Sequence, residues 1–139
     1  MERTVAEKMG VKQHSRAYIA NPDENAIAGI RLPELKIIKR LIGTFDYIHL
    51  FAKNQQQLEQ FFPKLKGYLA PNSMLWVSWP KAKQLGTDLN IKEVIRIGYD
   101  FGFVESTALS VNEVWSALKF TRPKEGKEYH NSYGTLNKD

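Results

Sequence analysis

The chain has 139 residues, of which 42% are hydrophobic and 25% charged, with no cysteine and a formal net charge of +5. This length fits one domain with one core, and the lack of cysteine excludes disulfides, thiol nucleophiles and thiolate metal sites. No apolar run approaches the roughly 18 residues that cross a bilayer, and the N-terminus lacks the apolar segment of a secretory signal. We therefore expect a soluble, cytoplasmic protein with no membrane contact.

Basic residues outnumber acidic ones, but they are scattered along the chain. The densest groups lie between Arg31 and Arg40 and at Lys81 and Lys83, and each is too short to form a basic arm. Scattered surface charge mainly serves solubility. A nucleic-acid accessory role is therefore the weakest interpretation, because only the net charge of +5 supports it.

The first third of the chain predicts short alternating elements. Thr4 and Gly10 flank VAEKM with a cap hydroxyl and a glycine stop, which predicts a short helix within an N-terminal extension of residues 1–15. The next turn, Asn21-Pro22-Asp23, is favoured because the residue before proline avoids the helical region. The other expected elements are a strand over Arg16–Ala20, a helix over Glu24–Ile30 and a strand over Leu35–Ile42.

The middle of the chain reads as strand, helix, strand. Phe45–Ala52 is nearly continuous in aromatic and branched residues, as expected for a central strand covered on both faces. Asn54 can cap the following helix. Pro63 predicts a kink or break in that helix, since an interior proline costs about 3 kcal/mol. Ala70-Pro71-Asn72 then predicts a turn before a buried strand over Met74–Trp79.

The last third predicts a helix followed by two strands. Asn90 and Glu93 have the spacing of a capping box, so a helix is expected from Ile91 to a glycine stop at Gly102. The strands predicted over Phe103–Leu109 and Val114–Thr121 must pair antiparallel, because four residues are too few for a crossover helix.

Together these elements predict one α/β domain over residues 1–122. We expect a single Rossmann-like, mostly parallel sheet of about six strands, with helices on both faces and a C-terminal antiparallel hairpin. Residues 123–139 contain only scattered apolar side chains and are expected to be a flexible tail, disordered or loosely docked. The oligomeric state is not specified by the sequence.

Polar residues gather where the predicted parallel strands end. Open α/β sheets usually bind ligands at the carboxyl ends of their strands, and the lysines there, with the amides that open the next helix, could receive a small anion. The alternative is a solvated loop that merely caps a helix. The candidate ligand-binding residues are Asn21, Asp23, Lys53, Trp79, Lys81, Lys83, Thr87, Asn112 and Glu113.

Other chemistry has little support in the sequence. His49 lies inside the central strand, which favours a buried, hydrogen-bonded histidine over a catalytic base. Neither paired histidine motifs nor clustered carboxylates occur, so no metal site is expected. Ser78 lacks the glycines of a nucleophile elbow. Trp79 could stack on a planar ligand, although tryptophans in small domains are more often core residues.

Four segments, FDYIHLFA, LAPNSMLWVSWPK, TDL and VNEVWSALKF, occur in this order along the chain. They resemble a bacterial family of small uncharacterised proteins that is known only as a domain of unknown function. The likeness covers most of residues 5 to 120. The resemblance implies no activity, because the family carries none.

A more distant likeness is to class I methyltransferases that use S-adenosylmethionine (SAM). Their late strands look like FDYIHLFA, a helix, LAPNSMLWV, another helix and a terminal antiparallel hairpin. Those enzymes place a glycine-rich turn after the first strand, whereas Ala20 is followed here by NPDENAIAGI with a single glycine. Close backbone approach to a cofactor favours glycine. SAM is therefore possible but disfavoured, and the cofactor stays unknown.

These observations favour a non-catalytic or regulatory module that binds a small anionic ligand or a protein partner at the carboxyl ends of its strands. The alternative is a divergent methyltransferase-like enzyme without the usual glycine-rich loop. Whether the chain is an enzyme is left open by the sequence.

Overall fold

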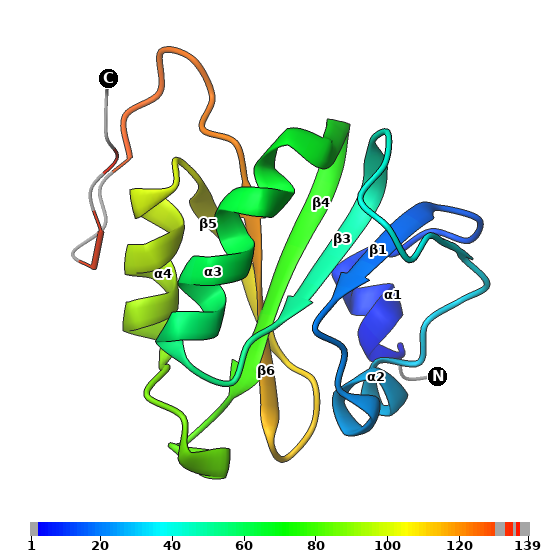
Figure 1. Cartoon of the computed structure of the whole chain (residues 1–139), viewed down its shortest axis with the longest axis horizontal. Helices are drawn as coiled ribbons and strands as arrows, with labels where there is room; N and C mark the ends of the chain where they lie inside the picture. The colour runs from blue at the N-terminus through cyan, green and yellow to red at the C-terminus, as the bar shows by residue number, and fades with distance from the viewer. Residues whose placement is uncertain (1–2, 130–132, 135, 137–139) are drawn as a thin grey trace.

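The computed structural model describes residues 3–129, 133–134 and 136, and in it a central sheet separates two layers of helices (Figure 1). The elements, with η for a 3-10 helix, are α1 Val5–Met9, β1 Arg16–Ala20, α2 Glu24–Ile30, β2 Lys36–Ile37, β3 Phe45–Phe51, α3 Gln55–Leu65, η1 Lys66–Tyr68, β4 Leu69–Pro80, η2 Gln84–Gly86, α4 Ile91–Asp100, β5 Val104–Ser110 and β6 Trp115–Thr121.

The six strands lie in the order β2-β1-β3-β4-β6-β5. The pairings of β1 with β2, β1 with β3 and β3 with β4 are parallel. The hairpin of β5 and β6 is antiparallel, as predicted. The sheet is nevertheless mixed rather than mostly parallel, because β6 inserts between β4 and β5 and pairs antiparallel with β4 as well.

Helices cover both faces of the sheet and define two apolar clusters. On one face, α3 and α4 bury side chains such as Leu58, Phe62 and Val94 against the sheet. On the other face, α1 and α2 contribute Met9 and Ile30 to a second cluster. Figure 1 shows the two helix pairs on opposite sides of the strands. The central position predicted for β3 is confirmed, since every residue of this strand except Asp46 is buried.

Pro63 does not break α3, which continues to Leu65 and passes directly into η1. Of the predicted kink or break, the break was wrong. Pro63 removes one backbone hydrogen bond, but the buried side chains Phe62 and Leu65 keep this turn packed on the core.

Two strands differ in extent from the prediction. The strand expected over Leu35–Ile42 is reduced to β2, because Ile38 and Leu41 reach the core from a loop instead. Conversely, β4 begins at Leu69, before the predicted Ala70-Pro71-Asn72 turn. The turn survives as an irregularity in the ladder with β3, and Asn72 has a left-handed backbone with φ of 60°.

The C-terminal segment turns back along α4. Tyr129 and Leu136 pack against the core cluster formed with α3 and α4, and Gly134 lies against Tyr99 of α4. The rest of the predicted tail, residues 130–132, 135 and 137–139, lies outside the described residues, so the division at residue 122 stays a prediction. Within the described part of the chain, no helix is long and apolar enough to span a bilayer.

Candidate functional site

The strands β1, β3 and β4 end at one edge of the sheet, here called the carboxyl edge, and the turn between β5 and β6 reaches the same edge. The backbone N–H of Lys81, just after β4, donates to the carbonyl of Val114 in that turn at 2.7 Å. The predicted site residues therefore surround this edge, but they form separate groups.

The first group links the segments that follow β1 and β3. The side-chain amide of Asn21 donates to the backbone carbonyl of Phe51 at 2.8 Å and to the Gln57 Oε1 atom at 3.2 Å. Asp23 caps α2 through the Ala26 N–H at 3.1 Å, and its carboxylate lies 3.8 Å from the Lys53 ammonium. In open α/β sheets the ligand crevice lies where the strand order reverses. Here polar side chains of the protein bond to one another and to the backbone at that place.

The second group lies after β4. The Lys81 ammonium donates to the Ser110 hydroxyl at 2.5 Å, and the Gln84 amide donates to the Glu113 carbonyl at 3.0 Å. The segment that follows Lys81 is strained, because three residues without the freedom of glycine have positive φ angles. They are Ala82, Lys83 and Leu85, with φ of 52°, 59° and 55°.

Two predicted residues serve the fold. The Asn112 Oδ1 atom accepts from the N–H groups of Val114 and Trp115, both at 2.9 Å, and its amide donates to the Asn25 side chain at 3.1 Å. Asn112 therefore shapes the hairpin turn and ties it to α2. Thr87 is 6% exposed, and its hydroxyl accepts from the Leu89 N–H at 3.0 Å. The side chains of Lys83 and Glu113 are exposed.

A cavity of about 400 Å³ opens beside Lys81, and we call it the Trp79 pocket. Trp79 is only 3% exposed and belongs to the core, so it forms the pocket wall rather than a free stacking platform. The residues that complete the lining were not predicted, because β5 and the start of α4 meet here only in three dimensions. They are Ala82, Asn90, Ile91, Ala108, Leu109, Ser110, Ser116 and Ala117.

His49 is fully buried and hydrogen-bonded, as predicted. Its Nδ1 atom lies 2.5 Å from the Tyr47 hydroxyl, and its Nε2 atom lies 2.6 Å from the Ser78 hydroxyl. Burial lowers the pKa of His49 to about 3 and raises the pKa of Tyr47. With Tyr47 donating to Nδ1, neutral His49 donates from Nε2 to Ser78. The network joins β3 to β4 inside the core, and none of its three residues lines the Trp79 pocket.

The described residues contain no group of three histidine, aspartate or glutamate side chains that could hold a metal ion. Trp76 and Trp115 are each 1% exposed and belong to the core beneath α1 and α2. These two tryptophans therefore pack, and they offer no surface to a planar ligand.

Comparison with solved structures finds methyltransferases with a similar fold. The ribosomal protein L11 methylase of Lactobacillus delbrueckii subsp. bulgaricus matches with a TM-score of 0.58 at 12% identity, over 86% of this chain and 75% of that chain. The magnesium protoporphyrin IX methyltransferase of Synechocystis PCC 6803 with bound SAH matches with a TM-score of 0.53 at 10% identity, over 86% and 78%.

The PH0226 protein of Pyrococcus horikoshii OT3 matches with a TM-score of 0.52 at 10% identity, over 86% of this chain and 88% of that chain. At such low identity these likenesses show the fold alone, and the chain has a class I methyltransferase-like fold. No protein-family model matches the chain, and no curated protein matches it either. The resemblance to the family of unknown function is therefore not confirmed.

Proposed function

We propose that this chain uses a methyltransferase-like fold to bind a small amphipathic anion in the Trp79 pocket, as a binding module rather than a methyltransferase. The observation that carries the proposal is the combination of an apolar wall with a lysine at one position of the fold. Trp79, Ile91 and Leu109 supply apolar surface, and Lys81 supplies the charge. Binding sites typically combine mostly apolar walls with a few polar groups in fixed places.

The charge of the pocket supports an anion. Its lining contains Lys81 and no acidic residue, and Lys83 follows two positions later on the exposed loop. The Ser110 hydroxyl accepts a hydrogen bond from one N–H of the Lys81 ammonium. The other two N–H groups are left to donate to a carboxylate or phosphate. The hydrogen bond to Ser110 also fixes where these donors lie.

Backbone strain in the loop after Lys81 supports the same position. A left-handed backbone at a residue with a side chain costs of order 1 kcal/mol or more, and such strain clusters at ligand-binding and active sites. Ala82 and Lys83 are consecutive examples, and Ala82 lines the pocket.

The closed crevice after β1 is the reason for preferring this pocket to a SAM site. Neither of the cavities at the two ends of β4 is lined by a residue of the Asn21-Pro22-Asp23 turn. Asn21 occupies the space near Phe51 and Gln57 instead, where the resemblance to methyltransferases implies a glycine-rich turn.

The test compares octanoate with octanol, which share an apolar chain and differ in charge. Titration of the ¹⁵N-labelled protein should show octanoate binding more tightly, with amide shifts near Lys81, Ile91 and Ala108. The variant Ala108→Trp fills the pocket at an exposed alanine, and it should abolish binding. The matched control Ala28→Trp, at an exposed position of α2, should bind as the parent does. Lys81→Ala should remove the preference for octanoate.

Two results would overturn the proposal: the absence of octanoate binding at millimolar concentration, or equal binding by the parent and the Ala108→Trp variant. The second would mean that octanoate binds elsewhere on the protein.

The fold likeness favours a second candidate, a divergent methyltransferase. Two of the structures that match contain bound SAH and bound SAM. A ligand at 100 times its dissociation constant adds about 2.7 kcal/mol to stability, which should raise the melting midpoint by roughly 10 °C in a domain of this size. Such a shift with SAM or SAH would support the enzyme. No shift at millimolar concentration would argue against it.

A further inference from the structure

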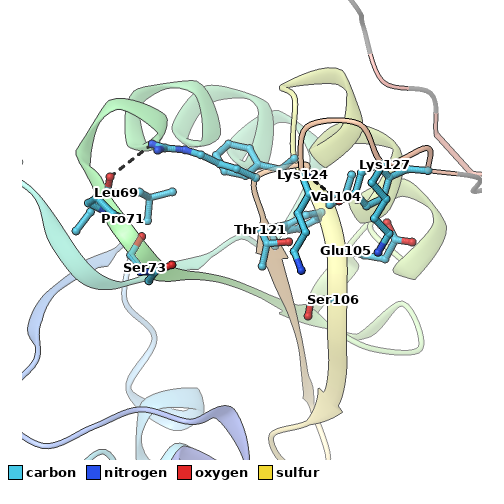
Figure 2. A pocket seen from close by; sticks show the side chains of 15 residues that line it. Leu69, Pro71, Ser73, Val104, Glu105, Ser106, Thr121, Lys124 and Lys127 are labelled. Atoms are coloured by element: carbon cyan, nitrogen blue, oxygen red, sulfur yellow. Dashed lines mark hydrogen bonds between the residues drawn. The ribbon is translucent and has the colours of Figure 1, made fainter.

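A larger cavity, of about 650 Å³, lies at the opposite ends of the strands from the Trp79 pocket. We call it the amino-edge cavity, because its walls are the starts of β4 and β5. The end of β6 and the segment 122–129 complete it. Figure 2 shows Leu69, Pro71 and Ser73 on one side, with Val104 and Ser106 on the other. Its volume lies within the range of roughly 300–1,000 Å³ that is typical of small-molecule sites.

Both flanking strands are irregular beside this cavity. On one side Phe45 pairs with Leu69 while Tyr47 pairs with Met74, so the start of β4 carries extra residues. On the other side the register of β5 against β6 shifts between Glu105 and Ala108. Such bulges are common next to functional sites, where they redirect side chains and leave backbone groups outside the ladder. Two of them flank the same space here.

Positive charge enters the cavity from the segment after β6. Arg122 is already engaged, since its guanidinium donates to the carbonyl of Lys66 at 3.0 Å. Lys124 and Lys127 also line the cavity, and neither takes part in an ion pair among the residues that the structure describes. Figure 2 shows the Lys124 side chain extending toward Thr121 and Ser106, and the Lys127 side chain extending toward Glu105.

Tyr129 holds these two lysines in place. Its hydroxyl accepts a hydrogen bond from the Lys124 N–H at 2.8 Å, and the Lys127 ammonium lies 5.1 Å from the centre of its ring. Tyr129 itself packs against the core. The cations are thus attached to an anchored turn, which lowers the entropic cost of gathering them around a ligand.

The cavity contains one carboxylate, that of Glu105, against the three cations Arg122, Lys124 and Lys127. Burial and the interaction with Glu105 raise the pKa of Tyr99 on α4, so this carboxylate faces α4. The balance of charge in the lining therefore stays positive and favours an anion.

We infer that the amino-edge cavity binds a small organic anion, one that carries a phosphate or carboxylate group on a partly apolar body. Lys124 and Lys127 would receive the anionic group, with hydroxyl donors from Ser73, Ser106 and Thr121 nearby. The buried rings of Phe103 and Phe120 form the apolar part of the lining. This site is separate from the Trp79 pocket, and it does not depend on the function proposed above.

The test is a titration of the full ¹⁵N-labelled chain with pyrophosphate, citrate and adenosine 5′-monophosphate. Pyrophosphate and citrate separate phosphate from carboxylate recognition, and the nucleotide adds an apolar body. We expect saturable amide shifts at residues 104–106 and 121–127, with the nucleotide binding more tightly than pyrophosphate.

The double variant Lys124→Ala/Lys127→Ala should weaken binding at least tenfold. Both side chains are exposed, so the fold should be kept. The matched control Lys36→Ala/Lys39→Ala removes two exposed lysines near β2, at the far end of the strand order, and it should bind as the parent does.

The inference would be overturned by equal losses in the two double variants, which would indicate adventitious ion binding only. It would also be overturned if none of the three probes shifts these amides at 10 mM. A third contrary result is affinity that increases steadily with oligonucleotide length, which would identify a nucleic-acid surface instead. The octanoate titration uses other residues, so its failure would leave this test intact.

Discussion

The two halves of the sheet differ in whether a cavity lies at the ends of their strands. Between β1 and β3, the place where open α/β sheets bind ligands, Asn21 and the Asp23–Lys53 pair fill the crevice. Around β4, β6 and β5, cavities of about 400 and 650 Å³ lie at the two opposite edges. The fold resembles methyltransferases over both halves, yet the candidate sites lie only in the second. A shared fold therefore locates possible sites, while local side chains decide which of them is open.

The first half of the sheet, β2, β1 and β3, joins the second half, β4, β6 and β5, through the pairing of β3 with β4. The buried His49 network connects these two strands. Neutral His49 bonds to Ser78 across the two strands. If this contact matters, acid should weaken the whole sheet rather than one half.

The largest effect should come from lowering the pH. The pKa of His49 is about 3 in the folded chain against an ordinary value of 6.5, because burial disfavours the charged ring. Between pH 6.5 and pH 3, His49 therefore binds a proton in the unfolded chain but not in the folded chain. Stability from this source is complete above pH 6.5 and falls by about 1.4 kcal/mol per pH unit toward pH 3. Urea unfolding at pH 6.5 and 4.5 should thus differ by about 2.3 kcal/mol from this source.

The control for this prediction is the other described histidine. His14 is exposed, so His14→Gln should keep the full pH dependence, whereas His49→Gln should flatten it. A parent protein with equal stability at both pH values would show that His49 is protonated in the folded state.

The next effect concerns the support of the second half. A Cβ atom added at Gly98 on α4 would collide with the Phe120 ring on β6. Overpacking of this kind costs about 1–3 kcal/mol, against a gain of up to about 1 kcal/mol in helix propensity. Gly98→Ala should therefore lower the free energy of unfolding by about 2 kcal/mol and displace α4 from the side of the sheet that carries both cavities.

Gly67→Ala is the matched control, because nothing lies within 4 Å of its added Cβ. Urea unfolding should show a change within about 0.5 kcal/mol for this variant. Equal losses at the two glycines would mean that close contact between α4 and β6 is not what stabilises this half.

A smaller effect should follow from opening the crevice in the first half. Asn21→Gly tolerates the φ of 51° but removes the hydrogen bonds to Phe51 and Gln57, so a loss of about 1 kcal/mol is expected. Asn72→Gly makes the same backbone change at a φ of 60° on an exposed residue, and it should be nearly neutral in thermal unfolding. A SAM-dependent rise in the midpoint of Asn21→Gly would contradict the assignment of binding to the second half.

Local signals explain which elements the sequence predicts well. The strand over Arg16–Ala20 and the helix over Glu24–Ile30 appear with the predicted bounds, because the Asn21-Pro22-Asp23 turn and the Asp23 cap specify their common boundary. Pairing is not local. The insertion of β6 between β4 and β5 depends on contacts between distant segments, and no motif at Trp115 or Val104 encodes it.

The same distinction applies to the candidate sites. Asn21, Asp23 and Lys53 meet as expected from parallel strands, since such strands end at one edge. The cavities require the neighbours Ile91 and Ala108, or Ser73 and Lys124, which are far apart in the sequence. Their juxtaposition follows from the register of β4, β6 and β5, which periodicity alone does not supply.

The smallest expected effect separates charge from shape in the closed crevice. Lys53 is about half exposed, at 49%, and lies 3.8 Å from Asp23, so water screens this pair and its contribution should be about 0.5 kcal/mol or less. Lys53→Met keeps most of the side chain's length and removes its charge. Urea unfolding of this variant should match the parent at 0.5 M salt and fall only slightly below it at low salt. A loss as large as that of Asn21→Gly would show that the ion pair, rather than the Asn21 amide, keeps the crevice closed, and the first half of the sheet would then open as ionic strength rises.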